Sequence, residues 1–116
     1  MVTLSEENYL KAIYHLGQQG TIAVSTNAIA DKIETKASSV TDMIKKLADK
    51  NLANYVKYQG VSLTNEGRLA AALVIRKHRL WEVFLVNKLN FSWEEVHEVA
   101  EQLEHVKSLK LVNELD

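Results

Sequence analysis

The chain has 116 residues, of which 47% are hydrophobic and 25% are charged, with a formal net charge of −1 and no cysteine. This length allows one domain, or one small domain and part of another, with a core small enough to make self-association plausible. Disulfides and thiolate metal ligands are excluded, and no apolar run approaches the roughly 20 residues that cross a membrane. Because no signal peptide is visible either, we expect a cytoplasmic protein.

The charge is unevenly distributed along the chain. Residues 1–63 carry seven basic and six acidic side chains, and residues 64–91 carry five basic and two acidic ones. Residues 92–116 carry two basic and seven acidic side chains. The first two-thirds can therefore approach a polyanion such as nucleic acid, whereas the last third repels one unless its charge is neutralised.

The N-terminal part predicts three short helices. Ser5 is expected to cap the first, which ends at the glycines of residues 17–20, and Ser25 is expected to cap the second. A third helix ends near Asn51, after a break in the pattern at residues 34–39. Its apolar spacing turns four side chains inward, namely Val40, Met43, Ile44 and Leu47.

A β-hairpin is predicted after these helices. Residues 52–63 alternate in polarity around a turn at Gln59-Gly60. Three short helices followed by a hairpin are typical of a winged helix-turn-helix, whose last short helix reads DNA. The same pattern also fits a small core with solvated lysines, so DNA binding is a hypothesis at this point.

The predicted DNA-reading surface consists of small polar and basic side chains. Hydroxyl groups at the start of a recognition helix reach base edges, and lysines meet phosphates. The predicted surface is Thr26, Asn27, Lys36, Ser38, Ser39, Thr41, Asp42, Lys45 and Lys46.

The C-terminal part predicts further helices. Thr64 is expected to cap a long helix that reaches Leu89, and Ser92 is expected to cap a shorter one that carries Val106. Residues 108–116 begin another apolar helix with little after it to bury against. We therefore expect the natural chain to continue beyond this sequence.

Three of the four histidines have a glutamate four residues away. The pairs are His78 with Glu82, His97 with Glu101, and His105 again with Glu101, while Glu104 lies beside the last. Residues at this spacing share one face of a helix. Imidazole and carboxylate together suit Mn, Fe, Co, Ni or Zn. A single such pair is more often a solvated ion pair, so a purely structural role stays open.

Two metalloenzyme classes fit poorly. The stretch HEVAE places Glu101 where a metalloprotease motif requires its second histidine. A di-iron bundle needs two Glu-x-x-His elements, and only Glu94 with His97 supplies one. We therefore expect no enzyme. The alternatives are a winged-helix regulator whose His/Glu pairs are only structural, or a small helical metal-storage protein.

Four segments together resemble a known family, the metal-dependent repressors of the diphtheria toxin repressor and manganese-transport repressor type. The first-helix and helix-turn-helix segments are SEENYLKAIYHL and IADKIETKASSVTDMIKKLADKNL. The linker-helix and metal-binding-helix segments are LTNEGRLAAALVIRKHRLWEVFLV and VHEVAEQLEHV. The resemblance implies a mainly α fold with a small β-hairpin wing. It assigns residues 1–70 to a winged helix-turn-helix domain and residues 71–116 to metal-binding and dimerisation helices.

The resemblance also implies the ligands of two metal sites. The primary site corresponds to Asn8, Glu101, Glu104 and His105, and the ancillary site to His78, Glu82 and His97. Manganese-specific members carry acids at the positions of both Asn8 and Lys11, so this chain departs from their pattern.

The implied function is repression. The family binds double-stranded operator DNA as a homodimer when it is loaded with Mn(II) or Fe(II), with no membrane and no small-molecule substrate. Dimer contacts are expected from the helices after residue 70, with Trp81, Leu85 and Leu89 as interface side chains.

Overall fold

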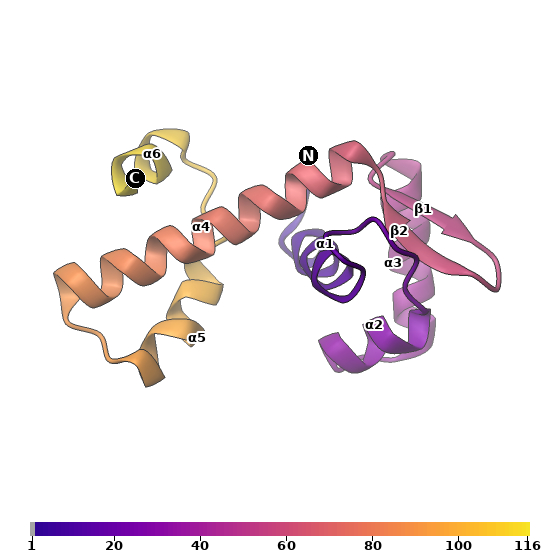
Figure 1. Ribbon diagram of the computed structural model, residues 1–116, viewed down its shortest axis with the longest axis horizontal. Coiled ribbons are helices and arrows are strands. Elements are labelled where there is room, and N and C mark those ends of the chain that lie inside the picture. The colour runs from indigo at the N-terminus through magenta and orange to yellow at the C-terminus, as the bar shows by residue number, and fades with distance from the viewer. Residues whose placement is uncertain (1) are drawn as a thin grey trace. The chain divides into compact units, whose positions relative to one another are not determined.

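The structure is a computed structural model that describes residues 2–116. In this range it contains six α-helices and one two-stranded sheet, in the order α1, α2, α3, β1, β2, α4, α5 and α6 (Figure 1). The chain divides into two compact units between Ala72 and Leu73, and α4 runs from the first into the second. The prediction of a mainly α fold with a β-hairpin wing is confirmed.

Helix α1 (Leu4–Leu16) begins earlier than expected. Its N-cap is Thr3 rather than the predicted Ser5. The Thr3 hydroxyl accepts from the backbone N–H of Glu6 at 3.1 Å, and the Glu6 carboxylate accepts from the backbone N–H of Thr3 at 2.8 Å. This reciprocal capping box satisfies two otherwise unpaired N–H groups, whereas Ser5 has no acid at the matching position.

The carboxylate of Glu6 also links α1 to the end of α3. Glu6 is 3% exposed, and its Oε1 atom accepts from Lys50 Nζ at 2.7 Å. Lys50 follows the last residue of α3 and is partly exposed. This ion pair joins residues that are far apart in the sequence, and the sequence pattern gave no indication of it.

We expect Glu6→Gln to lower the stability of this unit by about 1 kcal/mol at neutral pH. Burial by itself would raise the pKa of Glu6, but hydrogen bonds from Lys50 and Thr3 outweigh it and hold the pKa below its ordinary value. Because the folded-state pKa is the lower one, the stabilisation is complete above the unfolded-state pKa and is lost as pH falls through the folded-state pKa. Urea denaturation from neutral to strongly acid pH measures this. If the difference in the free energy of unfolding between the parent and Glu6→Gln stayed the same at strongly acid pH, this explanation would be wrong.

Helices α2 (Thr26–Ile33) and α3 (Ala37–Asp49) form the helix-turn-helix. Ser25 caps α2 as predicted, because its hydroxyl accepts from the N–H of Ala28 at 3.1 Å. Glu34 adopts a left-handed conformation with φ 62°, which ends α2 and turns the chain toward α3. The inward face of α3 is the predicted one: Val40, Ile44 and Leu47 are buried and Met43 is half-buried.

The wing consists of β1 (Ala53–Val56) and β2 (Gly60–Leu63), which pair antiparallel and reach away from the helices of this unit (Figure 1). The turn lies at residues 57–59, earlier than predicted, and Tyr58 at its centre has φ 69°. Gly60 already belongs to β2. A Cβ there would meet the backbone of Val24, which pairs with Val61 on the other edge of β2. The glycine is therefore needed for the close approach of Val24 as well as for its φ of 112°.

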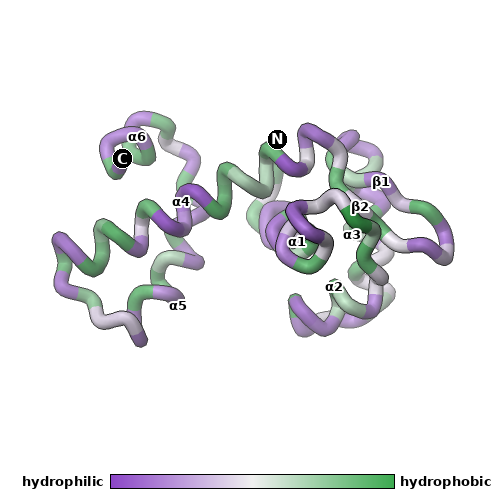
Figure 2. Tube along the Cα trace, in the orientation of Figure 1, coloured by the Kyte–Doolittle hydropathy of each residue, from purple (hydrophilic) through white to green (hydrophobic). Residues whose placement is uncertain are grey.

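The first unit has its own apolar core, drawn from α1, α2, α3 and the wing. Its fully buried side chains include Leu10, Ile13, Ile29, Ile44 and Leu47. Figure 2 shows hydrophobic residues recurring along these helices between hydrophilic ones. This core fixes α3 by its inner face and leaves its outer face to solvent.

The second unit consists of the C-terminal part of α4 (Asn65–Leu89), α5 (Trp93–Leu103) and α6 (Leu109–Leu115). The predicted caps are confirmed, because the Thr64 hydroxyl accepts from the N–H of Gly67 and the Ser92 hydroxyl from that of Glu95. Helix α5 ends at Leu103, earlier than predicted, so Val106 lies beyond it.

Two expectations from the sequence concern apolar side chains in this unit. Trp81 and Leu85 are buried inside the unit against Val96 and Ala100, whereas Leu89 is exposed, so that its interface role stays a prediction. In residues 108–116, Val112 is buried and Leu115 packs on the cluster of Trp81 and Ala100, whereas Leu109 and Leu111 are exposed as the sequence suggested. No helix in the described range 2–116 is long and apolar enough to cross a membrane.

Candidate metal centre and nucleic-acid interface

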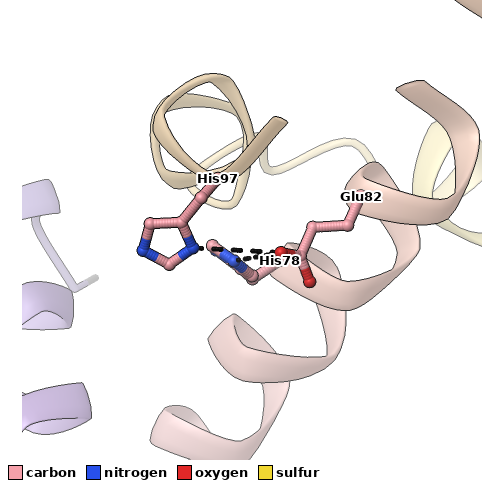
Figure 3. A group of neighbouring side chains, drawn as sticks. All are labelled: His78, Glu82 and His97. Carbon is pink, nitrogen blue, oxygen red and sulfur yellow. Dashed lines mark ion pairs between the residues drawn. The ribbon is translucent and has the colours of Figure 1, made fainter. Parts of the chain in front are cut away.

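Three metal-ligating side chains converge in the second unit. His78 and Glu82 lie one turn apart on α4, and His97 lies on α5 (Figure 3). One potential ligand atom from each lies within 4.8 Å of the other two. The helical spacing places the first two on one face, and the apolar contacts between α4 and α5 bring the third toward them.

The carboxylate of Glu82 is at the centre of this cluster. Its Oε2 atom lies 3.3 Å from His78 Nε2 and 3.9 Å from His97 Nδ1. Ligands that share one metal at about 2.0–2.2 Å lie roughly 3–4 Å from one another. The cluster therefore has the donor atoms and the spacing for a first-row divalent ion.

The side chains of the cluster become more exposed from His78 through Glu82 to His97. The side chain of His78 is 10% exposed, that of Glu82 25% and that of His97 64%. An ion therefore has access from the His97 side, and the three protein ligands leave coordination positions for water or for further groups.

The residues of the predicted primary site are not gathered into a cluster of this kind. Among residues 2–116, the structure brings together only the three side chains of the ancillary set within that limit. Glu101 is exposed and its Oε1 atom lies 2.9 Å from His97 Nε2. Glu104 is buried, with His105 Nε2 at 3.6 Å from its Oε2 atom. Asn8 lies on the exposed side of α1 in the other unit, so the primary site remains a prediction.

The predicted DNA-reading residues lie on the outer face of the helix-turn-helix. On α3 and at its N-cap, Lys36, Ser38, Ser39, Asp42, Lys45 and Lys46 are exposed. Thr41 is half-buried, and its hydroxyl donates to the carbonyl of Ala37 at 3.2 Å, which leaves its methyl group and oxygen lone pairs for a partner. On α2, Asn27 is exposed and Thr26 is half-buried at the first position of the helix.

The wing adds a further exposed group. Tyr58 is 93% exposed at the hairpin tip, and the Lys57 ammonium lies 5.2 Å from the centre of its ring. A cation held over an exposed aromatic ring suits a phosphate backbone, since it keeps a positive charge next to a stacking surface.

Comparison with known proteins assigns both parts of the chain. Residues 1–61 match the model of the iron-dependent repressor N-terminal DNA-binding domain, and residues 64–116 match that of the iron-dependent repressor metal-binding and dimerisation domain. The chain belongs to the iron-dependent repressor family. The resemblance inferred from its sequence segments is thereby confirmed.

Individual members of the iron-dependent repressor family agree with this assignment. Iron-dependent repressor IdeR of Mycobacterium leprae is 35% identical over 102 residues, which are 88% of this chain and 44% of that protein. The HTH-type transcriptional regulator MntR of Oceanobacillus iheyensis is 33% identical over 105 residues, which are 90% of this chain and 70% of that protein. The chain thus spans less than half the length of IdeR.

A solved structure shares the fold of this chain. A manganese-dependent transcriptional repressor in complex with manganese superposes with a TM-score of 0.83 at 40% identity, covering 96% of this chain and 50% of that chain. These relatives are transcriptional repressors and regulators, which are not enzymes.

Sequence reasoning missed two buried carboxylate contacts. Glu6 carries no functional prediction from the sequence, and it is the buried partner of Lys50. Glu104 was expected as a ligand of the primary site, and its Oε1 atom lies 2.7 Å from His78 Nδ1. One available signal was that each acid falls at a position where helical periodicity places an inward side chain.

Proposed function

We propose that this protein is a metal-responsive transcriptional repressor that binds operator DNA as a homodimer when loaded with Mn(II) or Fe(II). The observation that carries the proposal is the convergence of His78, Glu82 and His97 in a chain whose other unit is a winged helix-turn-helix. Regulation of metal-homeostasis genes and a cytoplasmic location follow from this activity.

DNA recognition is assigned to the outer face of α3. Ser38, Ser39 and Thr41 lie near the start of this helix, where side chains reach base edges in the major groove. Lys36, Lys45 and Lys46 are assigned to phosphates, which their exposure supports. A homodimer presents two such helices, which must lie about one DNA turn, roughly 34 Å, apart.

The metal response is assigned to the acidic second unit. His78, Glu82 and His97 hold one ion, and Asn8, Glu101, Glu104 and His105 supply ligands for another. When bound, a divalent ion supplies positive charge beside residues 92–116, which hold seven acidic and two basic side chains. Imidazole and carboxylate donors without thiolate are compatible with Mn(II) and Fe(II), the ions that the family resemblance implies. The metal can favour the DNA-binding state of the protein only by as much as it binds that state more tightly than the state that does not bind DNA.

The test is a DNA-binding titration of this chain under anaerobic conditions with Mn(II), Fe(II), Co(II) and Zn(II) in turn. We expect Mn(II) and Fe(II) to raise the affinity for double-stranded DNA of the operator, and chelation to reverse the effect. DNA affinity that is the same with and without every metal would contradict the metal response. Activation by Zn(II) at concentrations where Mn(II) and Fe(II) do nothing would overturn the metal preference alone.

Lys46→Ala is expected to weaken binding to all DNA sequences and to lower the slope of log K against log salt by about one. Lys46 is exposed on α3 and lies on the side of the helix next to Met43. Ser39→Ala is the comparison, because a base-edge contact changes preference at one base pair by about 1–3 kcal/mol and leaves the salt slope unaltered. Identical salt slopes for the parent and Lys46→Ala would remove this lysine from the interface.

A further inference from the structure

Each histidine of the metal cluster uses its two ring nitrogens differently. His78 directs Nε2 toward Glu82 at 3.3 Å, and its Nδ1 lies 2.7 Å from Glu104 Oε1. His97 has the opposite arrangement: its Nδ1 faces Glu82 at 3.9 Å, while its Nε2 lies 2.9 Å from Glu101 Oε1. In both rings, one nitrogen faces the cluster and the other faces a carboxylate outside it.

We infer that Glu104 and Glu101 are positioning residues of this cluster, which fix the tautomers of His78 and His97 so that opposite nitrogens, Nε2 of His78 and Nδ1 of His97, face the metal. This inference rests on the proposed metal-responsive function. It gives these two carboxylates a task that is additional to their proposed role as ligands of the primary site.

The physical argument starts from the neutral imidazole. It has one N–H donor and one lone pair, so donating the N–H to a carboxylate leaves the lone pair on the nitrogen that faces the metal. The carboxylate also fixes the orientation of the ring and raises the basicity of the ligating nitrogen. The two carboxylates therefore select different ligating nitrogens for the two histidines.

The two carboxylates are not expected to act equally. Glu104 and the His78 side chain are 1% and 10% exposed, so little water competes for their hydrogen bond. Glu101 and the His97 side chain are 51% and 64% exposed. Solvent screens an exposed pair strongly, so the contribution of Glu101 is the smaller one.

Glu104 is shared between the two sets of ligands. Its Oε1 atom holds His78, and its Oε2 atom lies 3.6 Å from His105 Nε2. A substitution at Glu104 therefore alters the ancillary cluster directly, and a loss of metal binding in such a variant does not identify a primary-site ligand. A measurement that reports each histidine separately is needed.

The first experiment uses Cd(II) as a diamagnetic probe, with an NMR-active cadmium isotope and isotope-labelled histidine nitrogens in the full 116-residue chain. The chain has only four histidines, so single substitutions assign every ring. We expect one-bond coupling from cadmium to Nε2 of His78 and to Nδ1 of His97. Coupling to Nδ1 of His78 or to Nε2 of His97 would overturn the inference, because those atoms would then have left their carboxylates.

The second experiment compares three charge-neutralising variants by the Cd(II) concentration that half-saturates the His78 and His97 signals. Glu104→Gln keeps an oxygen that accepts from Nδ1 but loses the carboxylate charge that raises the basicity of the ligating nitrogen, so it is expected to raise this concentration about 10-fold or more. Glu101→Gln is expected to raise it by a smaller factor. Glu98→Gln is the matched control, since it removes the same charge from the exposed surface of α5. Far-UV circular dichroism verifies that each variant is folded.

The outcomes separate this inference from the proposed function. If Glu104→Gln and Glu98→Gln bind cadmium equally well at these histidines, the positioning role is wrong and the metal response stands. If neither histidine of the parent senses cadmium, both this inference and the metal cluster of the proposed function are contradicted. The coupling pattern of the parent decides the assignment even where Glu104→Gln does not fold.

Discussion

His78→Ala is expected to lower the stability of the metal-free second unit by about 3 kcal/mol, because it leaves a buried carboxylate without its hydrogen-bond partner. The variant removes the Nδ1 atom that lies 2.7 Å from the Glu104 carboxylate, which is 1% exposed. Removing the imidazole leaves the buried Glu104 carboxylate without the partner at its Oε1 atom, and therefore without full compensation for its desolvation. Both tryptophans, Trp81 and Trp93, lie in this unit, so their fluorescence during urea denaturation reports its unfolding.

His97→Ala provides the matched control for this prediction. It removes the same imidazole from the same metal cluster, but its side chain is 64% exposed and its carboxylate partner is exposed as well. We expect a stability change within about 0.5 kcal/mol. Equal losses for the two variants would show that the buried pair is not the cause.

A second substitution tests the electrostatic explanation. Adding Glu104→Gln to His78→Ala should recover part of the lost stability, because a neutral amide costs less to bury than a carboxylate. In the parent background, the same change should be less harmful than His78→Ala, since an amide oxygen still accepts a hydrogen bond from Nδ1. If the double variant recovered no stability, the loss in His78→Ala would come from the volume of the missing ring and not from the buried carboxylate.

Elements whose signals are local in the sequence were predictable. Ser25, Thr64 and Ser92 cap their helices because a hydroxyl at that position reaches an N–H group three residues ahead. The inward face of α3 follows from apolar spacing alone. The pairing of His78 with Glu82 has the same origin, since four residues are one helical turn.

The contacts that shape the metal cluster are not local. His78 and Glu104 are 26 residues apart, and they meet only because α5 packs against α4 through Trp81 and Ala100. Helical periodicity gives the face of each helix, but it does not give the rotation of one helix about its axis relative to the other. For this reason, the sequence did not indicate the contact between Glu104 and His78, and the place of Glu104 in the predicted primary site came from the family resemblance alone.

The same reasoning applies to two further contacts that the sequence did not indicate. Lys50 and Glu6 are 44 residues apart, so no periodic pattern pairs them. At the C-terminal end, the chain returns after α5, and Arg76 on α4 meets the Asp116 carboxylate at 2.6 Å. Such returns depend on the turns between helices, where sequence signals are weakest.

The second large effect is expected in the DNA-reading unit, where Ile44→Ala should cost about 2–4 kcal/mol of stability. Ile44 is 1% exposed and belongs to the core that holds α3 by its inner face. The variant leaves a cavity beneath the recognition helix, and the lost contacts add to the lost hydrophobic transfer free energy. All four tyrosines lie in this unit, so near-ultraviolet absorbance of tyrosine during denaturation reports its unfolding apart from the tryptophan signal.

Lys45→Ala, at the next residue of the same helix, should give the reverse result. Its side chain is exposed, so the stability should change by less than about 0.5 kcal/mol, while DNA affinity and its salt dependence both fall. Ile44→Ala should weaken DNA binding only as far as it depopulates the folded unit, with the salt slope of the folded fraction unaltered. If Ile44→Ala lowered the salt slope, or if Lys45→Ala lowered the stability as much as Ile44→Ala, the inner and outer faces of α3 would be assigned wrongly. The two neighbours therefore test in one helix whether its buried side holds the fold and its exposed side meets DNA.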